Sequence, residues 1–190
     1  MQDLTEIRWH ARAGQGAVTA AKLVAETALE LDRYFQAMPE YGPERMGAPI
    51  QAFTRISGEP IEIHNNIEFP NVVVVLDETL LPIVDVSRGL RDDGTIIVNT
   101  CTPPADVRSR LGLTGGQVCT VDASGISLDT LKKDIPNTPM LGALAKSTGL
   151  FTPEQLIGHL KKTFGKKFAT EIIEANVAAV TRAFEEVQCA

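Results

Sequence analysis

The sequence predicts an α/β fold: a mostly parallel open sheet flanked by helices in three layers, Rossmann-like or flavodoxin-like, with a helical C-terminal third. Three observations support this fold class. Short strand-like runs alternate with helical runs through the first two thirds of the 190 residues. Residues 71–76 contain continuous valine and leucine, which is typical of a strand buried on both faces. Beyond Pro136 nearly every segment has helical periodicity, and no linker is visible, so residues 1–190 are expected to form one domain.

The expected strands are short apolar or alternating runs bounded by turn residues. Residues 61–64 are expected to pair with residues 50–57 as a hairpin across Gly58-Glu59-Pro60. In chain order the predicted strands are residues 6–10, 34–37, 50–57, 61–64, 71–76, 95–99 and 117–122. Because helices separate most of these runs, most of the strands are expected to run parallel.

The expected helices follow helical periodicity and local start signals. Pro82 would fall in the first turn of a helix over residues 79–90, where proline is tolerated. Thr152-Pro153-Glu154 is typical of an N-cap followed by proline, and Ser127 is expected to cap the helix that it begins. In chain order the predicted helices are residues 18–32, 79–90, 104–111, 127–133, 140–148, 153–164 and 167–187.

Composition argues against several function classes. A net charge of −6 without a Lys/Arg-rich run argues against a nucleic-acid partner. No apolar run approaches the length of a membrane helix, so no membrane insertion is expected, and the polar, acidic N-terminus is not a secretory signal. Cys101, Cys119 and Cys189 form no Cys-x-x-Cys pair, which argues against a zinc or iron–sulfur site in this chain. These scattered cysteines are expected to be reduced thiols of a cytoplasmic protein.

Gly14-Gln15-Gly16 connects the first predicted strand to the first predicted helix. Unpaired backbone N–H groups at such a helix start can bind a phosphate or another anion, and ligands of open α/β sheets gather beyond the C-terminal ends of strands. The spacing matches neither of the two common phosphate loops, so a simple tight connection is the alternative. Gln15 could orient a polar group. Arg12 is either a further anion ligand or a solvated or ion-paired arginine.

Residues 38–50 combine three prolines and two glycines with charged and aromatic side chains. Proline fixes φ and glycine permits tight turns, so the segment is predicted to be a shaped loop, the alternative being an ordinary surface excursion. Arg45 is a bidentate donor suited to a carboxylate or phosphate, with a structural pair to Glu40 or Glu44 as an equal alternative. Tyr41 could pack on a ligand ring or wedge the loop. The candidate site residues in this loop are Tyr41, Gly42, Pro43, Glu44 and Arg45.

Three segments of the chain resemble the gamma subunit of 2-oxoacid:ferredoxin oxidoreductases, a family that includes pyruvate synthase. They are His10-Ala11-Arg12-Ala13-Gly14-Gln15-Gly16, Pro39-Glu40-Tyr41-Gly42-Pro43-Glu44-Arg45-Met46-Gly47-Ala48-Pro49 and Pro136-Asn137-Thr138-Pro139-Met140-Leu141-Gly142-Ala143-Leu144. The likeness spans essentially the whole chain, and Tyr-Gly-Pro-Glu-Arg is its specific marker. The family's usual loop reads Gly-Arg-Gly-Gly-Gln-Gly. Ala11 and Ala13 are therefore departures, and they would reshape the loop if either position required a positive φ.

The resemblance implies a subunit that is not catalytically complete alone and holds no catalytic residue. The family's holoenzymes decarboxylate a 2-oxoacid on thiamine diphosphate, transfer the acyl group to coenzyme A and send electrons to ferredoxin or another acceptor, in some relatives NAD through a flavin subunit. Thiamine diphosphate, Mg2+ and iron–sulfur (4Fe-4S) clusters would lie in the partner alpha, beta and ferredoxin-like delta subunits. This chain would help form the coenzyme A site and cover the active site. The residues implied are Arg12, Gly14, Gln15, Gly16, residues 41–45 and Asn137.

Several alternatives stay open at this level. Pyruvate is the expected substrate, with branched-chain and aryl 2-oxoacids such as phenylglyoxylate as alternatives. The chain could instead be a stand-alone nucleotide- or flavin-binding module, or a purely architectural subunit. Asn137 could simply cap a helix. Asp92-Asp93-Gly94 with Asn99 does not fit a thiamine diphosphate signature, and no catalytic base is assigned to the isolated His10, His64 and His159.

Overall fold

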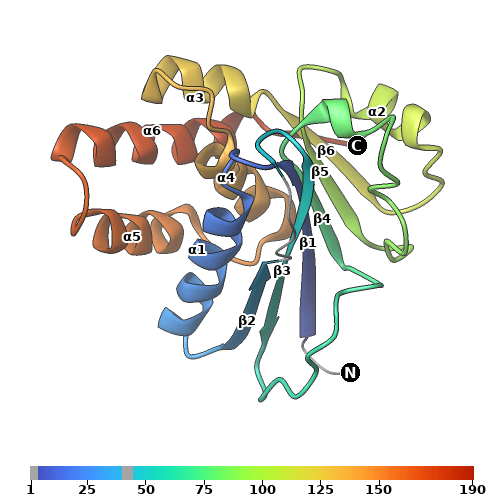
Figure 1. The fold of residues 1–190 in the computed structure, drawn as a ribbon, viewed down its shortest axis with the longest axis horizontal. Coiled ribbons are helices and arrows are strands. Elements are labelled where there is room, and N and C mark those ends of the chain that lie inside the picture. The colour runs from blue at the N-terminus through green and yellow to red at the C-terminus, as the bar shows by residue number, and fades with distance from the viewer. Residues whose placement is uncertain (1–3, 40–44) are drawn as a thin grey trace.

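The computed structural model describes residues 4–39 and 45–190, and it confirms the α/β fold with a helical C-terminal part (Figure 1). Within these residues a seven-stranded sheet has the order β2-β3-β1-β4-β5-β6-β7. The strands are β1 (Leu4–Arg12), β2 (Tyr34–Pro39), β3 (Pro49–Ser57), β4 (Val72–Val75), β5 (Thr95–Asn99), β6 (Gln117–Val121) and β7 (Gln188–Cys189). The helices are α1 (Ala17–Glu30), α2 (Pro104–Leu111), α3 (Ala123–Leu131), α4 (Asn137–Thr148), α5 (Pro153–Phe164) and α6 (Thr170–Glu186), together with the 3-10 turn η1 (Glu78–Leu80).

Strand β1 organises the sheet because both of its edges are paired. It runs antiparallel to β3 along its whole length and parallel to β4, and β5 and β6 continue the parallel part. β2 pairs antiparallel with β3 and therefore also runs parallel to β1. From β1 the chain first builds β2 and β3 on one side and then β4, β5 and β6 on the other. The topological switch point, where ligands of such sheets commonly bind, therefore lies between β1 and β4.

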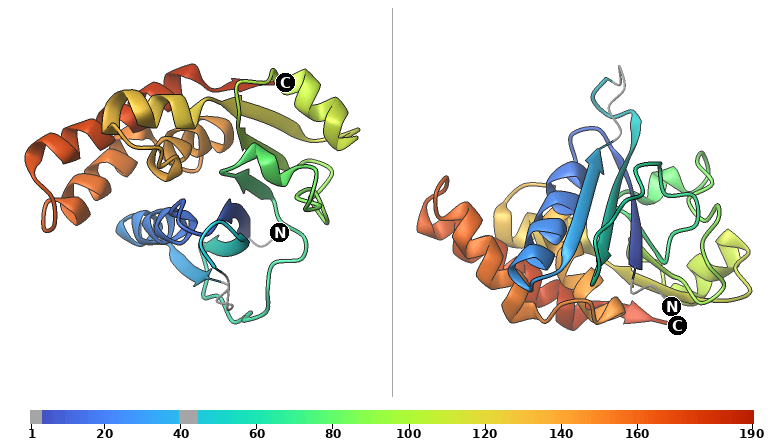
Figure 2. Two further views of the ribbon diagram at one scale, coloured as in Figure 1. Left: turned by 45° about the horizontal axis from the view of Figure 1, so that its top comes forward. Right: turned by 90° about the horizontal axis from the view of Figure 1, so that it is seen from below.

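Helices cover both faces of the sheet, which gives three layers (Figure 2). On one face, α1 and α4 pack against the strands around a core that includes Trp9 of β1, and α6 packs on the outside of α4. On the other face, α2 and residues 78–94 cover β4 to β6 around a smaller apolar cluster. Residues 137–145 of α4 are buried, since this helix lies between the sheet and α6. That arrangement explains the all-round apolar composition of α4.

Two predicted elements are wrong, each because a local signal was overridden. The helix over residues 79–90 does not form: only η1 is helical, and turns follow it. The helical turn begins at Glu78, so an α-helix would need the N–H of residue 82 to donate to the Glu78 carbonyl. Pro82 has no N–H, and the helix therefore does not continue. Residues 61–64 form no strand. Their backbone is held instead by the buried side chain of Arg55, whose Nη1 donates to the Ile63 carbonyl at 3.3 Å.

Helix ends were predicted well where a cap was read correctly. α2 and α5 have the predicted bounds, and Thr152 forms a capping box with Gln155. α3 begins four residues earlier than predicted, because Asp122 rather than Ser127 caps it and accepts a hydrogen bond from the Gly125 N–H at 2.8 Å. Ser127 instead accepts a hydrogen bond from the Ile135 N–H at 2.8 Å, which ties down the segment that leads into α4.

The expectation of three reduced thiols is contradicted by a disulfide between Cys119 and Cys189. The short strand β7, which the sequence did not predict, pairs with β6 and places these two residues directly opposite each other. Cys101 is exposed and is the free cysteine of the described residues. Because no local pattern marks the short strand β7, the pairing of two cysteines that lie 70 positions apart could not be predicted.

The α4–α6 contact makes a first prediction about stability. A Cβ added to Gly142 would lie 2.1 Å from the Val180 carbonyl oxygen, whereas one added to Gly158 would meet nothing within 4 Å. We expect Gly142→Ala to lower the free energy of unfolding by about 1–3 kcal/mol through overpacking. The matched helix glycine, Gly158→Ala, should raise it by up to about 1 kcal/mol through helix propensity. Urea unfolding followed by circular dichroism measures both, and equal effects of the two substitutions would contradict the observed packing.

The disulfide is tested by counting thiols. In the denatured, unreduced protein we expect one thiol, that of Cys101, to react with Ellman's reagent. After reduction, three thiols should react, in keeping with the three cysteines of the sequence. Three reactive thiols before reduction would show that Cys119 and Cys189 are not joined in the purified protein.

Candidate functional site

The two candidate loops meet at the carboxyl end of β1, beside the switch point. Ala13 N–H donates to the Ala48 carbonyl at 2.8 Å, and Gly47 N–H donates to the Ala13 carbonyl at 3.1 Å. These bonds extend the β1–β3 pairing beyond the end of the strands. The glycine turn after β1 and the C-terminal end of the proline-rich loop before β3 therefore form one continuous structure.

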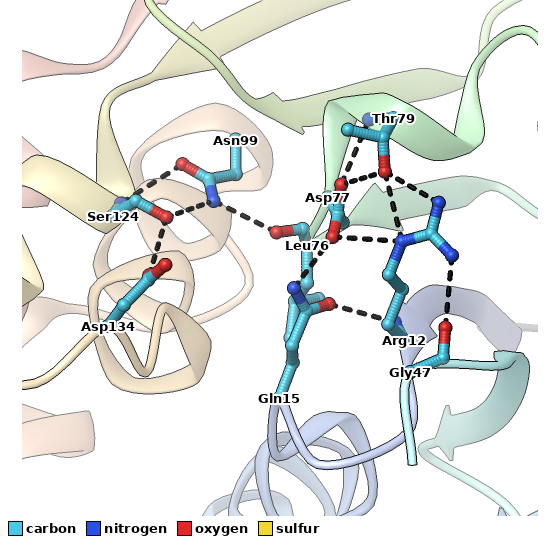
Figure 3. Close-up of polar contacts among 9 residues, drawn as sticks. All are labelled: Arg12, Gln15, Gly47, Leu76, Asp77, Thr79, Asn99, Ser124 and Asp134. Carbon is cyan, nitrogen blue, oxygen red and sulfur yellow. Dashed lines mark hydrogen bonds and ion pairs between the residues drawn. The ribbon is translucent and has the colours of Figure 1, made fainter. Parts of the chain in front are cut away.

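Arg12 crosses from this structure to the segment after β4 (Figure 3). Its Nη1 donates to the Gly47 carbonyl at 3.0 Å, and its Nε and Nη2 donate to Thr79 Oγ1 at 3.0 and 2.7 Å. Its Nε also lies 3.3 Å from Asp77 Oδ2. The structure thus shows the ion pair that the sequence left open as one alternative for Arg12, while the side chain stays 30% exposed.

Gln15 is fixed in the same network. Its Oε1 accepts a hydrogen bond from the Arg12 N–H at 2.8 Å, and its Nε2 donates to Asp77 Oδ2 at 2.8 Å. Burial alone would raise the pKa of Asp77, but the hydrogen bonds from Thr79 and Gln15 and the charge of Arg12 together lower it below its ordinary value. Asp77 is therefore an ionised acceptor at neutral pH.

Gly14 and Gly16 both adopt a positive φ, of 103° and 82°, which favours glycine. A Cβ on Gly14 would lie 2.7 Å from Met46 Cε, and one on Gly16 would lie 2.5 Å from Asn137 Nδ2. Neither Ala11 nor Ala13 has a positive φ, so the two departures from the usual family loop require no reshaping. Gly16 is the N-cap of α1 and supplies no side chain, so no side-chain cap competes for the N–H groups of the first turn.

Asn137 lies against the glycine turn from the other side. It is the first residue of α4, and Pro136 rather than Asn137 stands at the N-cap position. Its Oδ1 accepts from the Thr138 N–H at 2.8 Å, and its Nδ2 donates to the Gly16 carbonyl at 3.5 Å. The structure thus places Asn137 against Gly16.

The proline-rich loop is covered only in part. Tyr41, Gly42, Pro43 and Glu44 lie outside the described residues, as does Glu40. Arg45 is exposed, and its carbonyl accepts a hydrogen bond from the Ala48 N–H at 3.0 Å. Within residues 4–39 and 45–190 its guanidinium makes no hydrogen bond or ion pair.

Sequence reasoning missed a polar group between the ends of β4, β5 and β6 (Figure 3). Asn99 donates to the Leu76 carbonyl at 2.9 Å and accepts from the Ser124 N–H at 3.1 Å. Ser124 in turn donates to Asp134 at 2.8 Å. The available signal was a polar residue directly after, or at the end of, a buried apolar strand, which both Asp77 and Asn99 display.

His10 lies two residues before Arg12, but its side chain is buried. Its Nε2 accepts a hydrogen bond from Arg8 Nε at 3.1 Å, so the ring is neutral. Burial, with a smaller contribution from the charge of Arg8, lowers the pKa of His10 to about 3. Among the described residues no group of three or more His, Cys, Asp or Glu side chains could hold a metal ion. No helix in the same residues is long and apolar enough to cross a membrane.

The fold and this cluster of polar side chains define a class: a doubly wound α/β domain with glycine-shaped loops and fixed polar side chains at its switch point. Comparison with known proteins gives the family. The family model described as pyruvate ferredoxin/flavodoxin oxidoreductase matches residues 6–186. The chain belongs to this family, and it is the gamma subunit of a pyruvate or 2-oxoacid ferredoxin oxidoreductase. The resemblance seen in the three sequence segments is thereby confirmed.

Two relatives match this chain over nearly the full length of both sequences. The pyruvate synthase subunit PorC of Thermotoga maritima is 51% identical over 184 residues, which cover 97% of this chain and 95% of the relative. The common gamma subunit of the pyruvate/ketoisovalerate oxidoreductases of Pyrococcus abyssi is 47% identical over 185 residues, or 97% and 98%.

Two solved structures share the fold. The crystal structure of pyruvate oxidoreductase subunit PORC from Thermotoga maritima superposes with a TM-score of 0.87 at 46% identity, and the match covers 99% of both chains. A 2-oxoglutarate:ferredoxin oxidoreductase from Magnetococcus marinus, solved with 2-oxoglutarate, coenzyme A and succinyl-CoA bound, has a TM-score of 0.75 at 15% identity. That match covers 96% of this chain and 31% of the other, and it shows the fold alone.

The neutral, buried His10 makes a prediction about pH. Its pKa is about 3 in the folded protein and about 6.5 in the unfolded chain, so the unfolded state binds more protons between these values. The protein should keep its full stability above about pH 6.5 and lose it as the pH falls toward 3.

In His10→Gln, which keeps an acceptor for Arg8 but does not titrate, the loss should be shallower by up to about 1.4 kcal/mol per pH unit. Urea unfolding of both proteins between pH 4 and 7 measures this difference in slope. Parallel curves for the two proteins would contradict a neutral, buried His10.

Proposed function

We propose that this gamma subunit, within the assembled enzyme, forms part of the coenzyme A site and covers the thiamine diphosphate centre held by its partners. The observation that carries the proposal is the joining of the glycine turn and the proline-rich loop at the switch point through Ala13, Gly47 and Ala48. Both loops belong to the segments that mark the family. They lie at the switch point of the sheet, where ligands of open α/β sheets commonly bind. The coenzyme A bound in the Magnetococcus marinus enzyme, which shares the fold, supports the proposal.

The donor set fits a phosphate-bearing ligand. Gly14 and Gly16 form the tight turn that leads into α1, and Gly16 as N-cap brings no side chain to the first turn of that helix, where N–H groups and the helix dipole favour an anion. Arg45 adds an exposed guanidinium that can bind a phosphate with two parallel hydrogen bonds. Coenzyme A carries several phosphate groups, and this subunit would bind and orient them while partner chains supply the reacting groups.

We assign thiamine diphosphate, Mg2+ and the 4Fe-4S clusters to the partner subunits, because the described residues offer neither a metal-binding group nor more than one free cysteine. Such a cluster needs four cysteine thiolates. When bound in a partner, thiamine diphosphate supplies the carbanion chemistry that decarboxylates the 2-oxoacid. The partners would be alpha, beta and ferredoxin-like delta subunits in a cytoplasmic complex that passes electrons to ferredoxin.

We propose pyruvate as the 2-oxoacid, with selection of the acyl group residing in other chains. The Pyrococcus abyssi relative is named as a subunit common to the pyruvate and ketoisovalerate oxidoreductases. A subunit shared by two enzymes whose substrates differ in their acyl side chains is suited to bind the co-substrate that both enzymes use, which is coenzyme A. Branched-chain 2-oxoacids are therefore the second candidate for the complex that contains this chain.

A kinetic experiment on the assembled complex tests the role of Arg45. We expect Arg45→Ala to raise the KM for coenzyme A about tenfold, the value of one charge-assisted hydrogen bond, without changing the KM for pyruvate. The assay is pyruvate-dependent reduction of a viologen dye at varied coenzyme A. The matched control is Arg110→Ala, an exposed arginine on α2 away from the two loops.

An unchanged KM for coenzyme A in an intact Arg45→Ala complex would count against the proposal. A complex that dissociates more readily but keeps its coenzyme A kinetics would instead favour a purely architectural loop. Size-exclusion chromatography of both variants separates loss of assembly from loss of ligand affinity.

A further inference from the structure

The carboxylate of Asp77 collects four polar contacts at the switch point. Its Oδ1 accepts hydrogen bonds from the Thr79 N–H at 2.9 Å and from Thr79 Oγ1 at 2.5 Å. Its Oδ2 accepts from Gln15 Nε2 at 2.8 Å and lies 3.3 Å from Arg12 Nε. The side chain is only 15% exposed, and both oxygens are engaged. Asp77 is thus arranged to hold its neighbours, since neither oxygen is left to bind a ligand or accept a proton.

These contacts join three separate segments of the chain. Arg12 ends β1 and Gln15 lies in the turn between β1 and α1, whereas Thr79 belongs to η1. Arg12 also reaches the Gly47 carbonyl in the loop before β3. Because Arg12 also donates twice to Thr79 Oγ1, its guanidinium is held on two sides. Loss of the Asp77 charge would therefore loosen the glycine turn and the proline-rich loop together.

The network leaves Arg12 with donors to spare. Its guanidinium has five N–H groups, and contacts within the described residues use Nε, one N–H of Nη1 and one of Nη2. One N–H on each terminal nitrogen remains, and the side chain is 30% exposed. Two N–H groups on the terminal nitrogens of a fixed guanidinium form a fork that matches two oxygens of a phosphate. The value of that fork depends on its orientation, which Asp77 and Thr79 determine.

We propose that Asp77 is a positioning residue: it orients Arg12 and fixes Gln15, and so it sets the shape of the paired loops that receive the phosphate groups of coenzyme A. The identity of the ligand rests on the function proposed above. The positioning of the loops by Asp77 does not depend on that identity, so the two can be tested separately.

Asp77→Asn is the informative substitution because it keeps the size of the side chain. If the amide oxygen keeps the Thr79 contacts, the amide NH2 faces the Gln15 and Arg12 donors, which cannot pair with it. The matched control is Asp122→Asn. Asp122 also follows a buried strand, β6, and caps a helix, α3. Its cap hydrogen bond comes from the Gly125 N–H of that same helix.

Two measurements on the assembled complex test the proposal. By hydrogen exchange and mass spectrometry, we expect Asp77→Asn to speed exchange of the amides of Ala13, Gly47 and Ala48 about tenfold, and Asp122→Asn to leave them unchanged. In the viologen assay, Asp77→Asn should raise the KM for coenzyme A about fivefold to tenfold while kcat changes less than about twofold. In a double-mutant cycle, adding Asp77→Asn to Arg12→Ala should give little further effect, since Asp77 acts through Arg12.

The outcomes separate the two ideas. If exchange at these three amides does not change in Asp77→Asn, or if its effect on KM adds in full to that of Arg12→Ala, the positioning role is overturned. If exchange rises but Arg12→Ala leaves the KM for coenzyme A unchanged, Asp77 positions the loops and the proposed coenzyme A contact at Arg12 fails. If the Asp77→Asn complex does not assemble, Thr79→Val provides the same test, since it removes the hydroxyl that links Asp77 to Arg12.

Discussion

The pairing of β1 along both edges is the constraint on which the rest of this structure depends. Its antiparallel partner β3 brings the end of the proline-rich loop back to the end of β1, and its parallel partner β4 delivers Asp77 to the same edge. Register fixes these meetings, because Arg12 lies opposite Pro49 and His10 lies opposite Val75. A slip of one residue would turn Trp9 out of the core and Arg12 into it. The same register therefore determines both the core of the sheet and the polar contacts of Arg12.

Much of the fold could be predicted from the sequence because it rests on local signals. Pro104 and the Thr152 capping box identify α2 and α5, and an unbroken valine run identifies β4. Two of the failures have non-local causes. Residues 61–64 are held by a buried arginine on β3 rather than by a strand partner. The pairing of β7 with β6, and with it the Cys119–Cys189 disulfide, depends on where α6 ends against the sheet.

The candidate site likewise contains residues that local sequence signals predicted and residues that they did not. Gly14 and Gly16 were found because a strand, a tight turn and a helix follow one another in the sequence, and both prove to need a positive φ. Asp77 follows a buried apolar run, but its partner Arg12 is more than 60 residues away, so the local pattern did not show that Asp77 and Thr79 meet Arg12. The contact of Asn137 with Gly16 spans 121 residues and was not predicted; the resemblance to the family named Asn137 only as a candidate site residue. Tyr41, Gly42, Pro43 and Glu44 stay predictions.

The structure of the assembled enzyme with coenzyme A bound is the most direct test of the idea that this subunit presents two joined loops to that ligand. We expect a phosphate group of coenzyme A within hydrogen-bonding distance of the backbone amides at Gly14–Gly16 or of the Arg45 guanidinium, with the Arg12–Asp77–Thr79 contacts kept. A complex in which coenzyme A binds away from both loops, and in which Gly14 and Arg45 face solvent, would contradict the proposed role.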